Sequence, residues 1–198
     1  MDKINVVYID DMPDTHLEKY FDKYYKNENY EICYNSVLFD SNDGYESLLN
    51  NPVIQSANII FIDSILFENR SVTAGKFTGE EFKMVLNKFF PFIQIIVITQ
   101  NEKNPDIDML AKYNPNGGFK TPIEYYESII PSCMDVSIKL IKQYRVLASR
   151  ISDNDSWEKL LKERVLGTLN GTGEYDCLSK RDIDELICAF KEIEEHFK

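Results

Sequence analysis

The chain has 198 residues, 43% of them hydrophobic, which is enough to bury one sizeable core and argues against a disordered segment. Its formal net charge of −11 argues against DNA or RNA as the main partner, because nucleic-acid binders usually carry a basic face. The four cysteines form no CxxC pair and are expected to be reduced, and no signal peptide or membrane-length apolar run is seen, so we expect a soluble cytoplasmic protein.

Short apolar runs separated by polar segments predict the strands of a parallel sheet. Four of these runs are typical of strands that are buried on both faces. A shorter stretch, GGFKT, is a candidate for a fifth strand. The expected strands cover residues 4–9, 30–34, 58–62, 93–98 and 117–121.

Helical spacing of apolar residues fills the gaps between these runs. Thr78 and Glu81 fit a capping box at the start of one helix, and Pro131 is expected to break or restart the longest one. The expected helices cover residues 14–27, 43–51, 78–90, 105–113 and 122–150. The alternation predicts an α/β fold, a doubly wound five-stranded parallel sheet of flavodoxin-like order 2-1-3-4-5.

The pattern changes after about residue 150. Two further helices are expected, over residues 156–169 and 179–197, joined by a polar loop. Residues 153–198 hold seven Lys or Arg against twelve Asp or Glu, the opposite of a DNA-reading module. We therefore expect residues 1–150 to form the main domain, and residues 151–198 to form a small helical extension for interaction or dimerisation.

Acidic residues stand where the first and third strands are expected to end. In this strand order, ligands bind beyond the carboxyl ends of those two strands, which here carry Asp10-Asp11 and Asp63. The fourth strand ends in a hydroxyl group, Thr99. Crowded carboxylates require a cation or a shared proton, and Mg²⁺ prefers such oxygen ligands. A carboxylate beside Mg²⁺ can act as a nucleophile toward a phosphoryl group.

The motifs YIDD, FID, VIT and KTP, in this order over residues 3–145, resemble the receiver domain of two-component response regulators. The resemblance implies that Asp63 accepts a phosphoryl group from a histidine kinase or phosphotransfer protein. It implies that Asp10, Asp11, Asp63 and the backbone carbonyl of Ile65 hold Mg²⁺. Thr99 and Lys120 would complete the site.

The same resemblance describes a signalling protein and not an enzyme. Its chemistry would extend at most to self-phosphorylation and self-dephosphorylation. Phosphorylation would move Thr99 and reset a surface that binds a downstream protein, and a homodimer is compatible with this output.

Several residues depart from the receiver pattern. Receivers end the fifth strand in Lys-Pro, whereas this chain has Lys120-Thr121-Pro122, so Lys120 would face away unless a bulge corrects the register. The aromatic switch position falls on Gly117 or Gly118. The segment 66–78 is also longer than the corresponding loop of the family and could act as a lid or docking surface. These departures leave open a degenerate pseudo-receiver that binds a partner constitutively.

Two other interpretations of the acidic pair were weighed. Asp10 and Asp11 could simply cap the first helix, because Asp is favoured at that position. A haloacid-dehalogenase-type phosphohydrolase also places an Asp after its first strand, but it needs a second one two positions later, where this chain has Met12.

Overall fold

The computed structural model describes residues 2–39, 45–66, 78–100, 109–154, 156 and 159–170. The expected helix over 179–197 and most of the segment 66–78 lie outside these residues. Among the helices described, none is both long and apolar enough to span a membrane.

Five parallel strands form one sheet, in the order β2-β1-β3-β4-β5. The strands are β1 (Asp2–Asp10), β2 (Tyr30–Leu38), β3 (Ile59–Asp63), β4 (Gln94–Thr99) and β5 (Met109–Ala111). The predicted fold class and strand order are confirmed. β1, β3 and β4 coincide with apolar runs because each buries side chains on both of its faces, whereas the residues of β2 are half-buried or exposed, as suits a strand at the edge of the sheet.

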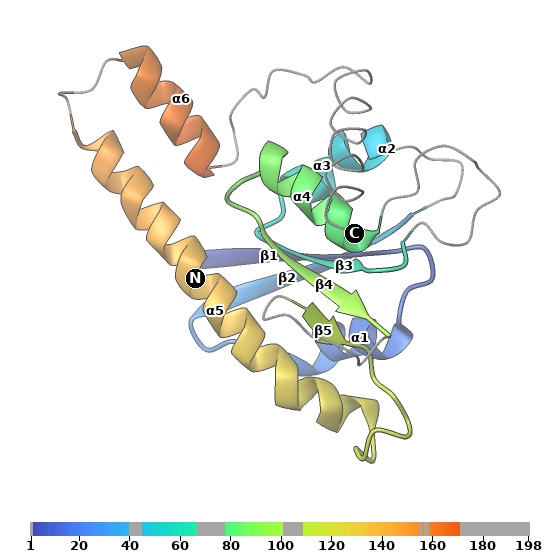
Figure 1. Ribbon diagram of the computed structural model, residues 1–198. Helices are drawn as coiled ribbons and strands as arrows, with labels where there is room; N and C mark the ends of the chain where they lie inside the picture. The colour runs from blue at the N-terminus through green and yellow to red at the C-terminus, as the bar shows by residue number, and fades with distance from the viewer. Residues whose placement is uncertain are drawn as a thin grey trace, which may run out of the picture.

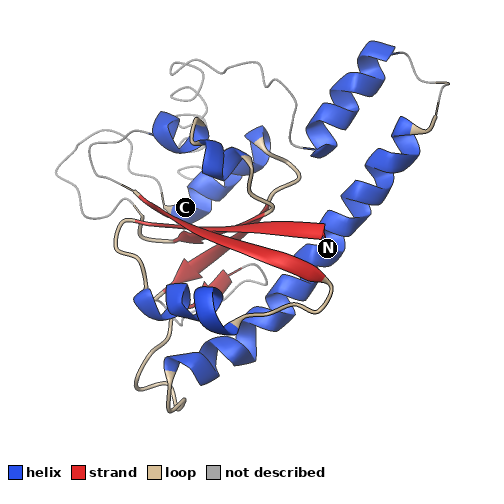
Figure 2. Cartoon of the chain, turned by 180° about the vertical axis from the view of Figure 1, so that it is seen from behind, coloured by secondary structure: helices blue, strands red, loops and turns tan. Residues whose placement is uncertain are grey.

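Helices cover both faces of this sheet (Figures 1 and 2). One face carries α1 with the π-helix η1 that continues it, and α5; the other carries α2, α3 and α4. Their bounds are α1 Thr15–Lys19, η1 Tyr20–Tyr24, α2 Tyr45–Leu49, α3 Pro52–Gln55, α4 Gly79–Phe89 and α5 Pro122–Ser152. The predicted capping box at Thr78 and Glu81 is present at the start of α4.

Strand alternation divides the core into two layers. On β1, Val7 and Ile9 pack toward α2, α3 and α4, while Val6 and Tyr8 pack toward α1 and α5. The same alternation continues on β3, where Phe61 faces α5. Side chains two positions after Tyr8 and Phe61, at the ends of β1 and β3, therefore also point toward the side of α1 and α5.

The prediction of the fifth strand was wrong. GGFKT does not form it; residues 117–121 are exposed and form turns and the approach to α5. The strand is instead Met109–Ala111, a stretch that was expected to be helical. Three half-buried residues on an edge strand leave no long apolar run, so hydrophobic periodicity cannot identify the strand.

The expected break at Pro131 is also absent, because α5 runs through it as one helix of 31 residues. Proline removes a hydrogen bond and crowds the preceding turn. Here Tyr126, Ile130 and Met134 are buried on both sides of the proline, and this packing holds the helix together. α5 also continues past residue 150, the expected domain boundary, before α6 (Lys159–Asn170) turns back beside it (Figure 1).

Candidate functional site: an acidic cluster with a buried lysine

The site begins with two buried carboxylates at the ends of neighbouring strands. Asp10 ends β1 and is 1% exposed, and Asp63 ends β3 and is 4% exposed. Ile9 pairs with Ile62, so the two aspartates follow the last paired positions side by side. Each lies two residues after a core residue on the α1 and α5 side, which places both side chains on the same face of the sheet.

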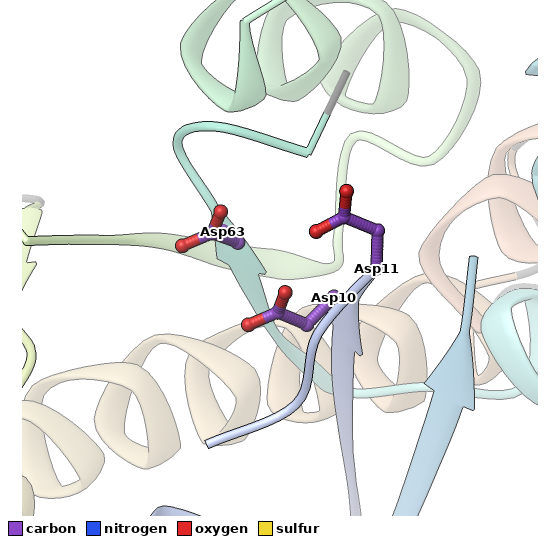
Figure 3. Close-up of side chains that lie close together, drawn as sticks. All are labelled: Asp10, Asp11 and Asp63. Atoms are coloured by element: carbon purple, nitrogen blue, oxygen red, sulfur yellow. The ribbon is translucent and has the colours of Figure 1, made fainter. Parts of the chain in front are cut away.

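Asp11 completes an acidic cluster with these two residues. One carboxylate oxygen from each of Asp10, Asp11 and Asp63 lies within 4.8 Å of the others. Figure 3 shows the three side chains gathered where β1 and β3 end. The structure thus brings together the three carboxylates that the sequence predicted to converge.

A lysine that the sequence analysis missed lies between the two buried carboxylates. The Nζ atom of Lys112 is 2.6 Å from Oδ1 of Asp63 and 2.9 Å from Oδ2 of Asp10. Its side chain is 10% exposed. Leu110 pairs with Ile98 on β4, and both face the α5 side, so Lys112, two residues on, points to the same side as the aspartates.

Lys120, the lysine predicted for this position, does not reach the site. It is exposed and directly precedes Thr121, whose side chain caps α5 by accepting a hydrogen bond from Glu124 N at 3.2 Å. A short apolar run, Met109–Ala111, directly precedes Lys112, and the turn-forming residues 114–118 follow shortly after; this pattern could have indicated a strand that ends at Lys112. The helical spacing of residues 105–113 and the proline after Thr121 favoured Lys120 instead.

The electrostatics of the pair follow from its burial. Desolvation by burial raises the pKa of Asp63, and this effect outweighs the opposing hydrogen bond and charge of Lys112; the charge of Asp10 adds to the rise. Burial acts to lower the pKa of Lys112, but hydrogen bonds and charges from Asp63 and Asp10 outweigh it and raise the pKa. Lys112 is therefore an ammonium at neutral pH, and the charged form of Asp63 is costly.

The backbone around the cluster is held by further hydrogen bonds. Ile65 N donates to Oδ2 of Asp63 at 3.0 Å, and Met12 N donates to Oδ1 of Asp10 at 2.8 Å. Thr99 is 4% exposed at the end of β4, and its carbonyl accepts from Lys112 N at 2.7 Å. The structure thus places Thr99 beside the strand end that carries Lys112. The Ile65 carbonyl as a metal ligand stays a prediction.

Gly79 fixes the backbone directly behind Asp63. Its N–H donates to the carbonyl of Ser64 at 2.9 Å, so the start of α4 lies against the end of β3. A Cβ atom at Gly79 would lie 2.2 Å from the carbonyl oxygen of Asp63, which real structures do not tolerate. The absence of a side chain at Gly79 is therefore needed for this close approach.

The charges of the described cluster favour a divalent cation. Three carboxylates face the single ammonium of Lys112, so two negative charges remain to be balanced. All three donors are carboxylate oxygens, the kind that Mg²⁺ binds through one or two groups while keeping several waters. Asp11, the least buried of the three, borders the more accessible side of the cluster. The residues present therefore fit a magnesium site.

Comparisons with known proteins give likenesses of fold only. No family model and no curated protein matches the chain. One similar solved structure is a two-component transcriptional regulator AraC from Clostridium phytofermentans ISDg, with 16% identity and a TM-score of 0.40, covering 73% of this chain and 98% of that one. Another is the two-component response regulator RcsB in complex with DNA, with 17% identity and a TM-score of 0.42, covering 88% of this chain and 95% of that one.

The acidic cluster lies at the place in the sheet where ligands are expected for this strand order. Asp10 and Asp63 end β1 and β3, the pair of strands at which the order 2-1-3-4-5 reverses direction and ligands bind. The chain therefore has a doubly wound, flavodoxin-like fold, with three carboxylates and one largely buried lysine at its switch point.

Proposed function

We propose that this chain is a receiver of a two-component pathway or phosphorelay, in which Asp63 accepts a phosphoryl group. The observation that carries the proposal is the ammonium of Lys112, bonded to Asp63 and Asp10 beside the third carboxylate, Asp11. This arrangement supports the proposal because the carboxylate that would act as nucleophile, a positive charge and a candidate cation site lie close together.

The reaction would transfer the phosphoryl group from a phosphohistidine to the carboxylate. An oxygen of Asp63 attacks phosphorus, the P–N bond breaks, and the imidazole leaves with the electron pair and takes up a proton. Lys112 would then exchange its bond with the Asp63 carboxylate for one with a phosphoryl oxygen. Thr99, at the neighbouring strand end, would supply a hydroxyl to another phosphoryl oxygen.

Asp10, Asp11 and Asp63, with the Ile65 carbonyl, would hold the magnesium ion. When bound, Mg²⁺ supplies positive charge to the phosphoryl oxygens as charge develops in transfer. Asp10 already accepts from Met12 N, Tyr8 Oη and Lys112 Nζ, so its carboxylate is fixed before any ion arrives. The phosphoryl donor would be a histidine kinase or phosphotransfer protein, and the output would be a changed surface for a downstream protein.

The test is incubation with acetyl phosphate and MgCl₂ followed by intact mass spectrometry. We expect the mass of one added phosphoryl group, lost on treatment with hydroxylamine, which cleaves acyl phosphates. Asp63→Asn should stay unlabelled, while Asp135→Asn, an exposed aspartate on α5, should be labelled like the wild type. No label on the wild type, or equal label on Asp63→Asn, would contradict the proposal.

A second test separates the two lysines. Lys112→Met should slow labelling strongly, because a fixed positive charge on the phosphoryl oxygens is lost, and Lys120→Met should leave it unchanged. The pseudo-receiver alternative was motivated in part by the position of Lys120, and the contacts of Lys112 with Asp63 and Asp10 weaken that part of the case. Two departures remain: β5, Met109–Ala111, contains no aromatic residue, and the segment 66–78 is longer than the corresponding loop of the family. Labelling without any change in partner binding would favour the scaffold interpretation.

A further inference from the structure

Two consecutive tyrosines of α5 hold the backbone on either side of Lys112. Tyr125 Oη donates to the carbonyl of Ala111 at 2.8 Å, and Tyr113 N donates to Tyr126 Oη at 3.2 Å. Lys112 is the residue between these two contacts. β5 is an edge strand of three half-buried residues, so its own packing fixes it weakly. The two hydrogen bonds with Tyr125 and Tyr126, here called the clamp, add contacts that fix the backbone at the end of this strand.

The tyrosine Tyr126 also connects this clamp to the acidic end of β1. Its hydroxyl donates to Oδ2 of Asp14, and Oδ1 of Asp14 caps α1 by accepting from His16 N at 2.8 Å and from Leu17 N at 3.4 Å. Asp14 therefore satisfies the start of α1 with one oxygen and binds α5 with the other.

Tyr8 closes the connection back to the site. Asp14 N donates to Tyr8 Oη at 3.2 Å, and Tyr8 Oη donates to Oδ2 of Asp10, the same oxygen that Lys112 binds. The contacts form a ring that starts and ends at Lys112. In chain order its members are Tyr8, Asp10, Asp14, Lys112, Tyr113 and Tyr126.

Tyr8, Asp10 and Tyr126 of the ring are buried, and Asp14, Lys112 and Tyr113 are half-buried, so water has only limited access to these hydrogen bonds. Tyr8 is 0% exposed and Tyr126 is 1% exposed. A buried polar group that loses its partner keeps its full desolvation cost. Loss of the Tyr126 hydroxyl would leave both the Asp14 carboxylate and the Tyr113 N–H without this partner. The ring therefore holds together as one unit.

We infer that Tyr126, with Tyr125, is a positioning residue for Lys112 and ties the acidic site to the start of α5. Neither hydroxyl touches Asp63. Their action is on the backbone that carries the ammonium, and through Asp14 and Tyr8 on the carboxylate of Asp10 that receives it. The placement of Lys112 is a feature of the structure itself, whereas its effect on phosphoryl transfer rests on the function proposed above.

The structure offers a matched control at the contact between η1 and α5. Tyr20 of η1 is 0% exposed, and its hydroxyl donates to Glu127 of α5 at 2.7 Å. Tyr20→Phe thus removes one buried hydroxyl that links the same two helical elements, one residue along α5 from Tyr126. The ring of Tyr20 packs against that of Tyr126, with centroids 6.0 Å apart, and Tyr20→Phe keeps this ring while removing a hydroxyl that bonds to Glu127.

The first measurement follows the Lys112 ammonium directly by ¹⁵N NMR of the unphosphorylated protein without Mg²⁺. The signal is assigned by its loss in Lys112→Met. In Tyr126→Phe we expect exchange of the ammonium hydrogens with water to rise about fivefold or more, the factor for one lost net hydrogen bond. In Tyr20→Phe it should stay within about twofold of the wild type.

Tyr125→Phe provides a second variant should Tyr126→Phe not fold, because Tyr125 is only partly buried. It should also raise the exchange, since the Ala111 carbonyl loses its partner. Unchanged exchange in both clamp variants, or an equal rise in Tyr20→Phe, would overturn the inference, because the hydroxyls would then act only through general packing.

The second measurement is the rate of labelling by acetyl phosphate. Tyr126→Phe should lower the rate about fivefold at saturating Mg²⁺, where a weaker hold of Asp10 on the ion no longer limits the rate. Equal rates in Tyr126→Phe and Tyr20→Phe would count against the inference. If the wild type is not labelled at all, the proposed function fails, and the ammonium measurement still decides the positioning role.

Discussion

The two strand ends that build the site are stabilised in different ways. β3 has five residues, all buried, and lies in the middle of the sheet between β1 and β4. β5 has three half-buried residues at the edge and is held from outside by hydrogen bonds from α5. Asp63 is thus placed by the core of the sheet, whereas Lys112 is placed by its backbone hydrogen bond to Thr99 on β4 and by contacts of its neighbours with a helix that follows it in the chain.

The negative and the positive charges of the site therefore come from differently stabilised parts of the sheet. The carboxylates are fixed where hydrophobic burial is greatest, and desolvation raises the pKa of Asp63 as a result. The compensating ammonium belongs to Lys112, which directly follows a three-residue edge strand without a fully buried residue. We therefore expect the site to be most easily disturbed from the β5 side, where fewer contacts hold the backbone.

The largest expected effect comes from removing the buried cation. Lys112→Met leaves Asp10 and Asp63 buried without their shared partner, and this should cost about 3 kcal/mol of unfolding free energy at pH 7 in EDTA. Lys120→Met should stay within about 0.5 kcal/mol because Lys120 is exposed. Urea denaturation with unchanged m-values measures both. Equal effects would show that Lys112 does not compensate the cluster.

Substitution of two glycines by alanine compares how well the backbone tolerates a side chain behind Asp63, at Gly79, and in the turn after Lys112, at Gly118. Gly79→Ala forces a Cβ against the Asp63 carbonyl, and we expect a loss of about 2 kcal/mol as α4 and β3 move apart. Gly118 has a φ of +90° with open space around it, so Gly118→Ala should cost only about 1 kcal/mol through backbone strain. Thermal and urea unfolding check this order. A reversed order would mean that the Asp63 backbone can adapt.

Thr121 tests whether the FKTP segment serves the helix alone. Thr121→Ala removes the N-cap of α5 and should cost about 1 kcal/mol, while Thr121→Ser keeps the hydroxyl and should restore most of it. Labelling by acetyl phosphate should not change in either variant at temperatures where both are folded. Slower labelling in the folded Thr121→Ala protein would show that Thr121 also contributes to phosphorylation.

The smallest expected effect concerns pH and Asp63. Because the folded-state pKa of Asp63 is raised, the unfolded chain loses its proton first as pH rises from the ordinary value, and stability falls through the interval up to the folded pKa. Asp63→Asn should lack this fall. We expect its unfolding free energy to exceed that of the wild type at pH 7 and to match it below the ordinary carboxyl pKa. Unfolding free energies measured across this pH range, without Mg²⁺, provide the check; a constant difference would contradict the assignment.

The parts that could be predicted from the sequence are those in which one residue pattern has one structural solution. β1, β3 and β4 were recognised because they are buried on both faces and so read as apolar runs, and β2 was recognised from the weaker run over residues 30–34. Asp10, Asp11 and Asp63 were found because they follow those runs directly. The capping box at Thr78 was found because it depends on two residues three positions apart.

The parts that could not be predicted depend on packing against distant segments. Met109–Ala111 has too few residues to show a period, and its identity as a strand depends on pairing with β4 and on the clamp from Tyr125 and Tyr126. Pro131 has a strong local preference for breaking a helix, and burial of α5 residues on both sides overrides it.

The sequence by itself determined the fold class, the strand order and the convergence of three carboxylates, because hydrophobic burial and strand alternation act through neighbours in the chain. Only the tertiary structure decided which lysine balances those carboxylates. Lys112 and Lys120 are equally plausible as isolated residues. Lys112 reaches the site because the short strand β5 pairs with β4 and its end is hydrogen-bonded to α5. These contacts join residues that are distant in the chain, so local sequence patterns do not reveal them.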